Sequence, residues 1–313
     1  MKILILGSSG FIGGHICQHL KERGDINLFS LSRHGTDDLY IIKNYKYVSI
    51  VSVITTLKKN QEAMKAFFKE NKFDIVINAI SYGVNYADQD MGMAKKINAQ
   101  MVENFYILSS QTGVTKFIHF GSSEEYGKMN GIINEGTPFN PVSTYGVSKQ
   151  IGINSLLKLE SQNNTNNLIV LRLFSIFGTR EGANKLIPYL LNAIKTKSEA
   201  LMTGGLQMRN YLYIDDLLGI IDYIINNLNK KHELIYNVAS NETITIRSIA
   251  QRISLITGEK INLSWGKVDY REDESFDFIV NTDKLDAYLN YKYQNYSFED
   301  GLWKIINEDK NEQ

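Results

Sequence analysis

Short apolar runs alternate with amphipathic stretches along the first half of the chain. A continuous apolar run suits a strand that is buried on both faces of a parallel sheet, and apolar residues that return every three to four positions indicate a helix. The runs predict strands at residues 2–6, 27–31, 45–53, 73–79, 116–120 and 168–173. The stretches between them predict helices, including residues 61–71, 88–112 and 145–160. This alternation predicts an α/β fold with a doubly wound parallel sheet, in which ligands bind at the carboxyl ends of the strands.

Three glycines, Gly7, Gly10 and Gly13, stand between the first predicted strand and the helix that follows it. Gly7 permits a tight turn, Gly10 lets a phosphate approach the backbone, and Gly13 lets the helix pack closely on the strand. The free amides and the dipole of the helix N-terminus would face a pyrophosphate. The sequence therefore predicts a dinucleotide cofactor at this turn. The same turn supplies three further cofactor-binding candidates: Ser9, Phe11 and Ile12.

The end of the second predicted strand bears on the choice of cofactor. A fold that binds NAD usually places an acidic residue here, against the ribose 2′-hydroxyl. This chain has Ser32 followed by Arg33, and an arginine suits a 2′-phosphate. We expect NAD(P) as the cofactor and favour NADP(H) over NAD(H). The alternative is that Arg33 is an exposed residue of a loop.

Three more residues are candidates for contact with the dinucleotide. Asn78 and Ala79 close the fourth predicted strand, where they would lie against the second phosphate and its ribose. Asn98 lies inside the predicted helix 88–112, although asparagine is unfavourable in helix interiors. We interpret it as the source of a structural hydrogen bond or the site of a bound water near the reacting groups. The alternative is an exposed asparagine.

Tyr145 and Lys149 lie four positions apart in a predicted helix and would project from the same face. An ammonium group beside a phenol lowers the pKa of the phenol towards working pH. Ser122, after the fifth predicted strand, would share the same substrate oxygen. These three side chains predict a proton relay for oxidising an alcohol or reducing a carbonyl group. The alternative is an ordinary amphipathic helix with an exposed tyrosine and lysine.

Composition narrows the classes of function. The chain of 313 residues has 34 basic and 34 acidic residues, so neither nucleic acid nor a membrane surface is an expected partner. The single cysteine excludes an internal disulfide, and His15 and His19 lack further ligands, so we expect no metal. The N-terminal apolar run is too short for a signal peptide or a membrane span, so we expect a cytoplasmic protein.

Five motifs occur in a fixed order along nearly the whole chain. They are Gly7-x-x-Gly10-x-x-Gly13, Asn78-Ala79, Ser122 with Tyr126-Gly127, Tyr145-x-x-x-Lys149, and Arg209-Asn210-x-x-Tyr213-Ile214-Asp215-Asp216. With these motifs the chain resembles the extended short-chain dehydrogenase/reductase family. Within that family it is similar to the nucleotide-sugar epimerases, 4,6-dehydratases and 4-ketoreductases.

The resemblance implies roles for individual residues. Tyr145 would be the acid/base at the C4 oxygen of the sugar, Lys149 would also hold the nicotinamide ribose, and Ser122 would share the C4 oxygen. Arg209 and Arg271 would clamp the diphosphate of a nucleotide-diphosphate sugar, since a planar arginine binds phosphate with two hydrogen bonds. The other substrate-binding candidates are Ser123, Ser175, where the family often has asparagine, and Asn184.

The resemblance also implies a domain plan. Residues 1–174 would form a dinucleotide-binding Rossmann domain, to which residues 213–238 return. Residues 175–212 and 239–313 would form mainly a smaller substrate domain. The family commonly dimerises through a four-helix bundle, here residues 91–112 and 145–160 from each copy, so we expect a homodimer.

The type of reaction stays open among related chemistries. Glu124 follows Ser122 closely and is a candidate for the extra acid/base of a 4,6-dehydratase, but related reductases also have this glutamate. We favour a C4 oxidoreductase, that is a 4-ketoreductase or 4-dehydrogenase for deoxysugar or surface-polysaccharide precursors. The alternatives are a 4-epimerase and a 4,6-dehydratase. A more distant alternative is a non-catalytic protein that senses the dinucleotide.

Overall fold

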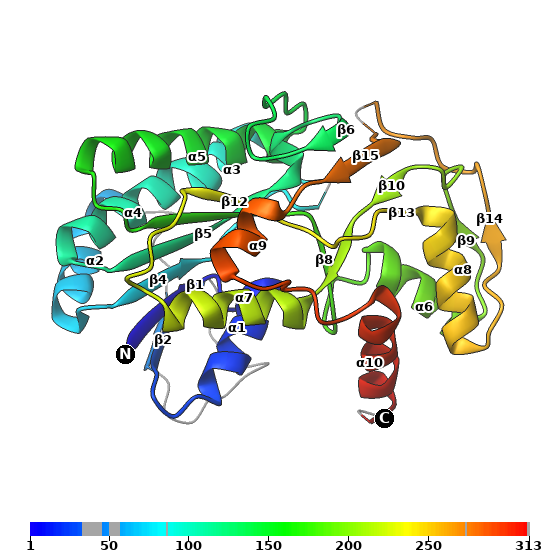
Figure 1. Cartoon of the computed structure of the whole chain (residues 1–313), viewed down its shortest axis with the longest axis horizontal. Helices are drawn as coiled ribbons and strands as arrows, with labels where there is room; N and C mark the ends of the chain where they lie inside the picture. Colours follow the sequence, from blue (N-terminus) through cyan, green and yellow to red (C-terminus); the bar gives the residue numbers. More distant parts are fainter. Residues whose placement is uncertain (33–45, 50–56, 86, 273, 312–313) are drawn as a thin grey trace. The chain divides into compact units, whose positions relative to one another are not determined.

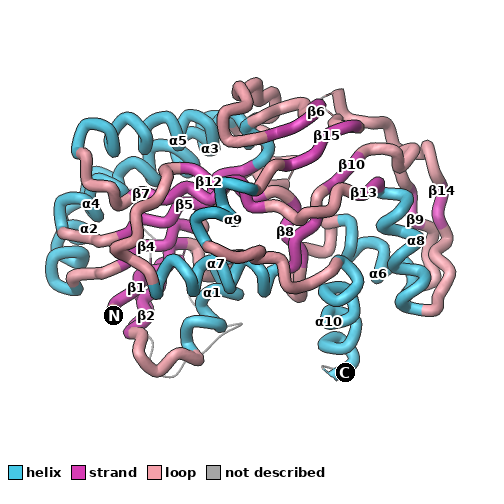
Figure 2. Tube along the Cα trace, in the orientation of Figure 1, coloured by secondary structure: helices cyan, strands magenta, loops and turns pink. Residues whose placement is uncertain are grey.

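The largest sheet has seven strands in the structure, a computed structural model that describes residues 1–32, 46–49, 57–85, 87–272 and 274–311. Its strands lie in the order β12-β7-β5-β4-β1-β2-β3 (Figures 1 and 2). They are β1 (Lys2–Leu6), β2 (Asn27–Ser32), β3 (Lys46–Ser49), β4 (Ile75–Asn78), β5 (Lys116–Ser122), β7 (Leu168–Leu173) and β12 (Ile235–Val238). β1 pairs in parallel with β2 and β4, β2 with β3, and β4 with β5. The predicted doubly wound parallel sheet is confirmed.

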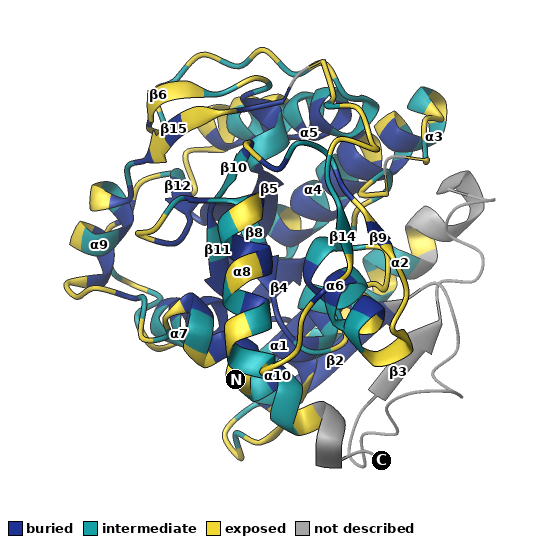
Figure 3. Cartoon of the chain, turned by 90° about the vertical axis from the view of Figure 1, so that its right-hand side faces the viewer, coloured by how far each residue is buried: buried dark blue, intermediate teal, exposed yellow. Residues whose placement is uncertain are grey.

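Helices cover both faces of this sheet. They include α1 (Phe11–Lys21), α2 (Leu57–Asn71), α3 (Met91–Lys95), the π-helical segment η1 (Lys96–Met101), α4 (Val102–Thr112) and α5 (Thr144–Asn163). In Figure 1, α2, α4 and α5 lie on one face and α1 on the other. Every residue of β4, β5 and β7 is buried, and Figure 3 shows β4 and β5 in the dark blue of buried residues. Burial on both faces explains why these strands are continuous apolar runs.

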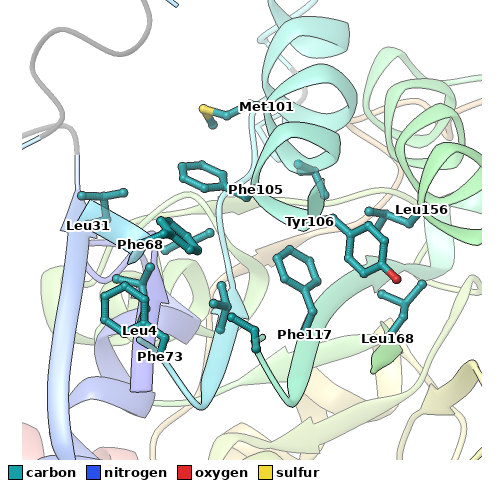
Figure 4. Close-up of a cluster of buried hydrophobic side chains, with 14 of the residues drawn as sticks. Leu4, Leu31, Phe68, Phe73, Met101, Phe105, Tyr106, Phe117, Leu156 and Leu168 are labelled. Atoms are coloured by element: carbon teal, nitrogen blue, oxygen red, sulfur yellow. The ribbon is translucent and has the colours of Figure 1, made fainter. Parts of the chain in front are cut away.

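A cluster of aromatic residues fills the space between the sheet and helices α2 and α4. The rings of Phe68 and Phe73 meet edge to face with their centroids 5.4 Å apart, and Phe68 stacks on Phe105 at 6.3 Å. All three are at most 3% exposed. Figure 4 shows them with Leu4 and Phe117 in one contiguous group. Burial of each such side chain contributes about 2–3 kcal/mol to folding, so this core fixes the strand ends that carry the candidate site.

The chain divides into two compact units. Unit 1 comprises residues 1–125, 141–172 and 222–236, and unit 2 comprises residues 126–140, 173–221 and 237–313. The predicted domain plan placed residues 126–140 with the dinucleotide-binding part, whereas they lie in unit 2. The reason is a strand pair of long sequence separation: β6 (Asn130–Ile133) pairs in parallel with β15 (Asp277–Val280). No local sequence pattern predicts the pairing of two strands so far apart in the chain.

Unit 2 is built from small two-stranded sheets and helices. The pairs are β8 (Ser175–Phe177) with β11 (Tyr211–Tyr213), β9 (Ala200–Leu201) with β14 (Leu263–Ser264), and β10 (Met208–Arg209) with β13 (Ile244–Thr245). The helices are α6 (Leu186–Thr196), α7 (Ile214–Asn226, which continues into unit 1), α8 (Ile246–Thr257), α9 (Asp283–Leu289) and α10 (Phe298–Asn311). Tyr126, Phe174 and Phe278 belong to a buried cluster in this unit.

The predicted helix 88–112 is interrupted. It begins at Met91, where the Asp90 carboxylate accepts a hydrogen bond from the amide of Met93 at 3.0 Å, and it passes through η1 before α4. The extra residue of a π-turn bulges the helix, a feature that often marks functional sites. Within the described ranges, no helix combines the length and apolar character that a membrane span requires.

Candidate active site

The glycine turn joins β1 to α1, and its backbone segments pack closely against one another. Gly7 has a left-handed backbone with φ +88°, and its carbonyl accepts the amide of Gly10 at 3.1 Å. A Cβ on Gly13 would stand 2.2 Å from the Gly7 carbonyl oxygen, so only glycine fits there. The first turn of α1 carries no acidic side chain. A backbone cradle without negative charge fits a pyrophosphate.

The other cofactor-binding candidates lie in this turn and in the first turn of α1. Ser9 is exposed and Phe11 and Ile12 are half-buried. The Phe11 ring meets His15 edge to face at 5.0 Å, which ties the first turn of α1 together. Ser32 is the last residue of β2, one strand away from β1. Arg33, on which the preference for NADP(H) was based, lies outside the described residues.

Asn78 is buried and makes its side-chain hydrogen bonds within unit 1. Its Oδ1 accepts the amide of Ile80 at 3.2 Å, and its Nδ2 lies 2.9 Å from Nδ1 of His119. The amide of the next residue, Ala79, continues the sheet by donating to the Leu6 carbonyl at 2.9 Å. Asn78 therefore fixes the chain that leaves β4, and its side chain is directed at β5.

Asn98 is completely buried in η1 and acts as a structural clamp. Its Oδ1 accepts the amide of Tyr82 and its Nδ2 donates to the Tyr82 carbonyl, both at 2.8 Å. Nδ2 also donates to Oγ of Ser148 at 2.9 Å. The structural hydrogen bond interpreted from the sequence is confirmed, and the exposed alternative is wrong. The clamp ties the segment after β4 to the helix that carries Tyr145.

The end of β5 is fixed by a buried ion pair. The Ser122 amide donates to Oε1 of Glu125 at 2.6 Å, while Oε2 of Glu125 accepts Nε of Arg172 at 2.8 Å. Both charged side chains have no exposed surface. Burial raises the pKa of Glu125, and the attraction of Arg172 opposes that rise. Sequence reasoning missed this pair because its members are 47 residues apart, so no local pattern connects them.

Glu124, in contrast, is half-buried at the edge of the same turn, η2 (Ser123–Glu125). Its amide donates to Oγ of Ser122 at 3.2 Å, and its carboxylate accepts the hydroxyl of Ser143 at 3.3 Å. Ser143 in turn caps α5 by accepting the amide of Gly146 at 3.0 Å. The Ser122 oxygen thus receives one bond from the backbone and keeps its own proton available for a substrate oxygen.

Tyr145 lies in the first turn of α5 and is half-buried. Burial raises the pKa of its phenol, and the carboxylates of Glu125 and Glu124 raise it further. Hydrogen bonds with the side chains of Ser122 and Ser81 lower the pKa but do not offset the rise. This direction is opposite to the lowering expected from Lys149. The predicted meeting of Tyr145 with Ser122 is present.

The physical reason is where Lys149 points. Its Nζ donates to the Phe120 carbonyl at 2.5 Å and lies 3.4 Å from Nε2 of His119. Burial lowers the pKa of Lys149 to about 8, and Glu125 counteracts this. The Nζ atom of Lys149 is thus engaged with β5. His119 itself is completely buried, and sequence reasoning missed it because it sits within an apolar strand.

Arg209 of unit 2, a substrate-binding candidate, is partly exposed and is held by an ion pair. The Arg209 guanidinium donates to Oε1 of Glu274 at 2.6 Å and to the Met208 carbonyl at 2.7 Å. Glu274 also connects to Arg271, whose carbonyl accepts the Glu274 amide at 3.2 Å. Glu274 was missed because it lies in an irregular loop.

Ser175 is half-buried in β8 and Asn184 is exposed before α6. Ser123, in unit 1, is half-buried as the first residue of η2.

Comparisons with known proteins agree with this architecture. The chain is 26% identical over 282 residues to the dTDP-D-glucose 4,6-dehydratase of Dictyostelium discoideum, a match that covers 80% of this chain and 61% of that protein. It is 23% identical to the CDP-abequose synthase of Salmonella muenchen, over 97% of both chains. Its fold is similar to the solved structure of UDP-glucuronic acid 4-epimerase from Bacillus cereus in complex with UDP-glucuronic acid and NAD. That likeness has a TM-score of 0.84 at 20% identity and covers 98% of this chain and 99% of the other.

The family match extends along most of the chain. The model that describes the NAD dependent epimerase/dehydratase family matches residues 3–239. This range contains the glycine turn, the buried relay residues and Arg209. The chain therefore belongs to the NAD dependent epimerase/dehydratase family, within the group of extended short-chain dehydrogenases that its motifs indicated.

Proposed function

We propose that the protein is an NAD(P)-dependent nucleotide-sugar C4 oxidoreductase, a 4-ketoreductase or 4-dehydrogenase of the extended short-chain dehydrogenase type. The observation that carries this proposal is the meeting of the Tyr145 phenol with the Ser122 hydroxyl at the carboxyl end of β5. Two strands away in the same sheet, β1 ends in the glycine cradle. A pair of hydroxyl groups beside a dinucleotide cradle suits proton transfer to a sugar oxygen.

The cradle and the strand ends would hold the cofactor. Gly7, Gly10 and Gly13 would receive the pyrophosphate, and the segment after β4 would lie along the cofactor. When bound, the nicotinamide supplies or accepts hydride. The B. cereus structure contains NAD, whereas Ser32 and Arg33 favour NADP(H). Comparing the affinities for the two dinucleotides, and repeating the comparison with Arg33→Ala, tests that preference.

The phenol of Tyr145 suits the role of proton donor in the reduction of a ketone, and its burial beside Glu125 and Glu124 favours the protonated form. A phenol that keeps its proton at neutral pH is ready to donate it to the C4 oxygen as hydride arrives at the carbon. Ser122 would hydrogen-bond the same oxygen and keep it facing the phenol. Oxidation of an alcohol would need the phenolate first, which the nearby Glu125 and Glu124 disfavour.

A nucleotide-diphosphate sugar is the proposed substrate. Arg209 and Arg271 are the proposed partners of its diphosphate, and Ser123, Ser175 and Asn184 are further proposed contacts. The curated relatives include a synthase named for CDP-abequose and a dehydratase named for dTDP-D-glucose, so the nucleotide base is the first variable to test.

A second candidate function is 4,6-dehydration, which Glu124 favours. This carboxylate stands next to Ser122 in a half-buried position, where it has the reach of an additional acid/base. Exchange of Glu124 for glutamine separates the two functions. Ketone reduction would continue in that variant, whereas loss of the C6 hydroxyl group would stop.

The experiment uses purified protein with the GDP, UDP, dTDP and CDP forms of a 4-keto sugar and with NADH or NADPH. We expect stoichiometric consumption of the reduced cofactor with one of these substrates. Conversion of a nucleotide sugar without net cofactor consumption would replace the proposal with an epimerase or a dehydratase. Cofactor binding with no turnover on any nucleotide sugar would support a sensor.

We also propose a homodimer in which α3, η1, α4 and α5 pack against their copies as a four-helix bundle. Gln100 of η1 and Asn154 and Lys158 of α5 are exposed on these helices. Light scattering after size-exclusion chromatography tests this. A dimer that Asn154→Arg disrupts is the expected result, and a monomer at all concentrations contradicts it.

A further inference from the structure

A buried histidine on β5 connects two strands to Lys149. Asn78 of β4 and His119 of β5 are register partners in the parallel pair. His119 lies with Nδ1 2.9 Å from Nδ2 of Asn78 and with Nε2 3.4 Å from Nζ of Lys149. Asn78, His119 and Lys149 are at most 2% exposed. Bulk water therefore cannot form hydrogen bonds with the imidazole nitrogens of His119.

The orientation of the Asn78 amide determines which ring nitrogen carries the proton. The amide of Ile80 donates to Oδ1 of Asn78 at 3.2 Å, which leaves Nδ2 facing the imidazole. An amide nitrogen can only donate, so Nδ1 of His119 must accept. A neutral imidazole has one acceptor and one donor. Its proton is then on Nε2, directed at Lys149.

An ammonium group cannot accept that proton. A protonated Lys149 has three N–H donors and no lone pair, so it would face the Nε2–H donor of His119. The 3.4 Å separation of the two nitrogens exceeds the usual hydrogen-bond range, whereas the bond to the Phe120 carbonyl is 2.5 Å. The long contact with His119 fits two groups that do not form a strong hydrogen bond.

A second lysine–histidine pair in unit 1 provides the contrast. Nζ of Lys116, on the same strand, lies 2.8 Å from Nε2 of His232 and 2.9 Å from the Asn166 carbonyl. Nδ1 of His232 faces the Glu233 carbonyl at 2.9 Å, which can only accept, and Nε2 also lies 3.1 Å from the Asn166 carbonyl. Both ring nitrogens of His232 thus face a carbonyl oxygen, and the shorter contact, to Glu233, favours the proton on Nδ1. Nε2 then accepts a hydrogen bond from the ammonium of Lys116, which also donates to the Asn166 carbonyl.

We propose that His119 is a positioning residue whose tautomer is coupled to the charge of Lys149. With Nε2–H, as Asn78 orients it, the ring faces a neutral amine. When Lys149 takes up one proton from solvent, the imidazole remains neutral but carries its proton on Nδ1. The Asn78 amide must then present Oδ1 to the ring and release the Ile80 amide. The pair gains one proton in total.

Other charged groups act on the same lysine. Glu125 of η2 favours the ammonium form of Lys149, and Arg172 of β7 partly compensates the charge of Glu125. Tyr145 lies one helical turn before Lys149 on α5. The tautomer of His119 affects the charge of Lys149 in addition to these charged groups. Its effect depends on the direction of hydrogen bonds and not only on charge.

This coupling reaches the proposed reaction through Ile80. Release of the Ile80 amide would affect the segment that carries Ser81, whose hydroxyl interacts with Tyr145. The inference rests on the proposed function only for that effect on turnover. The tautomer and the lysine charge are properties of the protein itself and are measured without substrate.

The test is ¹⁵N NMR of the full chain, whose five histidines are few enough to assign by single substitutions. Long-range ¹H–¹⁵N spectra report the tautomer of His119, and ¹⁵N-labelled lysine reports the charge of Lys149. We expect His119 to change from Nδ1–H to Nε2–H as pH rises, with the same midpoint as Lys149. His232 should keep Nδ1–H. A His119 ring that carries Nδ1–H at every pH overturns the proposal.

Two variants sharpen this result. Asn78→Leu removes the donor to Nδ1 and should raise the Lys149 midpoint by roughly one pH unit, the size expected for one lost hydrogen-bond constraint. His119→Gln presents an acceptor oxygen to the lysine and should raise it similarly. His232→Gln is the matched control and should leave Lys149 unchanged. An unchanged Lys149 midpoint in both test variants contradicts the coupling, even if the protein proves to have a different enzymatic activity.

Discussion

The candidate relay in unit 1 and the candidate diphosphate clamp in unit 2 are held in different ways. Ser122 and Lys149 are at least nine-tenths buried, and protein groups on strands and helices fix both of them. Arg209 has a side chain that is 28% exposed and is held by Glu274 and its own neighbour's carbonyl. The relay is built into the seven-stranded sheet and α5, whereas Arg209 lies on the two-residue strand β10 and its partner Glu274 lies in a loop. The groups for the chemistry thus rest on long elements of the sheet, and the proposed groups for substrate recognition rest on short ones.

Among the tests of the relay, Tyr145→Phe should have the largest effect on activity. Removing one hydroxyl leaves the packing of α5 unchanged but removes the proton donor, so hydride transfer should slow by about 10³-fold. Dinucleotide affinity should stay within a factor of about two. Single-turnover kinetics and equilibrium binding measure the two effects. Activity close to that of the unaltered protein would remove Tyr145 from the relay.

Arg172→Met tests the buried ion pair with Glu125, which fixes the end of β5 next to the relay. It leaves the Glu125 carboxylate buried without its partner, which should lower the free energy of unfolding by about 3–5 kcal/mol. Urea denaturation measures this loss. Adding Glu125→Gln should recover part of it because the orphaned charge is gone. A double variant that is no more stable than Arg172→Met would contradict the ion-pair explanation.

Gly13→Ala probes the cofactor cradle. Its Cβ would meet the Gly7 carbonyl oxygen at 2.2 Å. The oxygen belongs to the backbone and the position of Cβ is fixed by the backbone, so neither moves easily. We expect a loss of about 2–3 kcal/mol in unfolding free energy and weak dinucleotide binding. Gly24→Ala is the control, since nothing lies within 4 Å of its added methyl group. Equal effects of the two substitutions would contradict the close approach.

The pH dependence of stability tests the burial of Lys149. Its pKa in the folded state is about 8, against 10.5 ordinarily, so the folded state binds the proton less tightly. Its contribution to stability is therefore unfavourable below pH 8 and recovers as pH rises to 10.5. Lys149→Met should be more stable than the unaltered protein at neutral pH by about 2 kcal/mol. A difference that does not shrink across that pH window would be inconsistent with a depressed pKa.

Substitution of the proposed diphosphate clamp should have a smaller effect than substitution of the relay, and it should change KM instead of kcat. Arg209→Lys keeps the charge but loses the planar fork, so the KM for a nucleotide sugar should rise about tenfold with little change in kcat. Arg247→Lys is the control, because Arg247 stacks on Trp265 in the same unit. If Arg209→Lys lowered kcat and left KM unchanged, Arg209 would belong with the catalytic groups.

The same comparison explains which features the sequence reveals. The buried strands, the glycine turn and the Tyr145 helix depend on residues close in sequence, so periodicity and spacing locate them. Glu125–Arg172 and Asn78–His119 pair across 47 and 41 residues, and strand register sets the second of these pairs. The reversal of the expected Tyr145 shift has the same origin, since it follows from burial and from the unforeseen Glu125.

The π-turn of η1 has a consequence for how the chain tolerates change in length. The carbonyl oxygen of Asn98 would stand 2.1 Å from a Cβ on Gly152, so the bulge and the glycine of α5 form one close contact. Each residue of a regular helix advances the side chains by about 100°. A π-turn takes up one extra residue locally, so deleting a single residue from η1 would straighten the helix and leave the side chains of α4 in register. Deleting a residue from α4 itself would turn Phe105 away from the aromatic core, because no bulge there absorbs the change. The chain should therefore tolerate the loss of one residue in η1 better than the loss of one residue in α4.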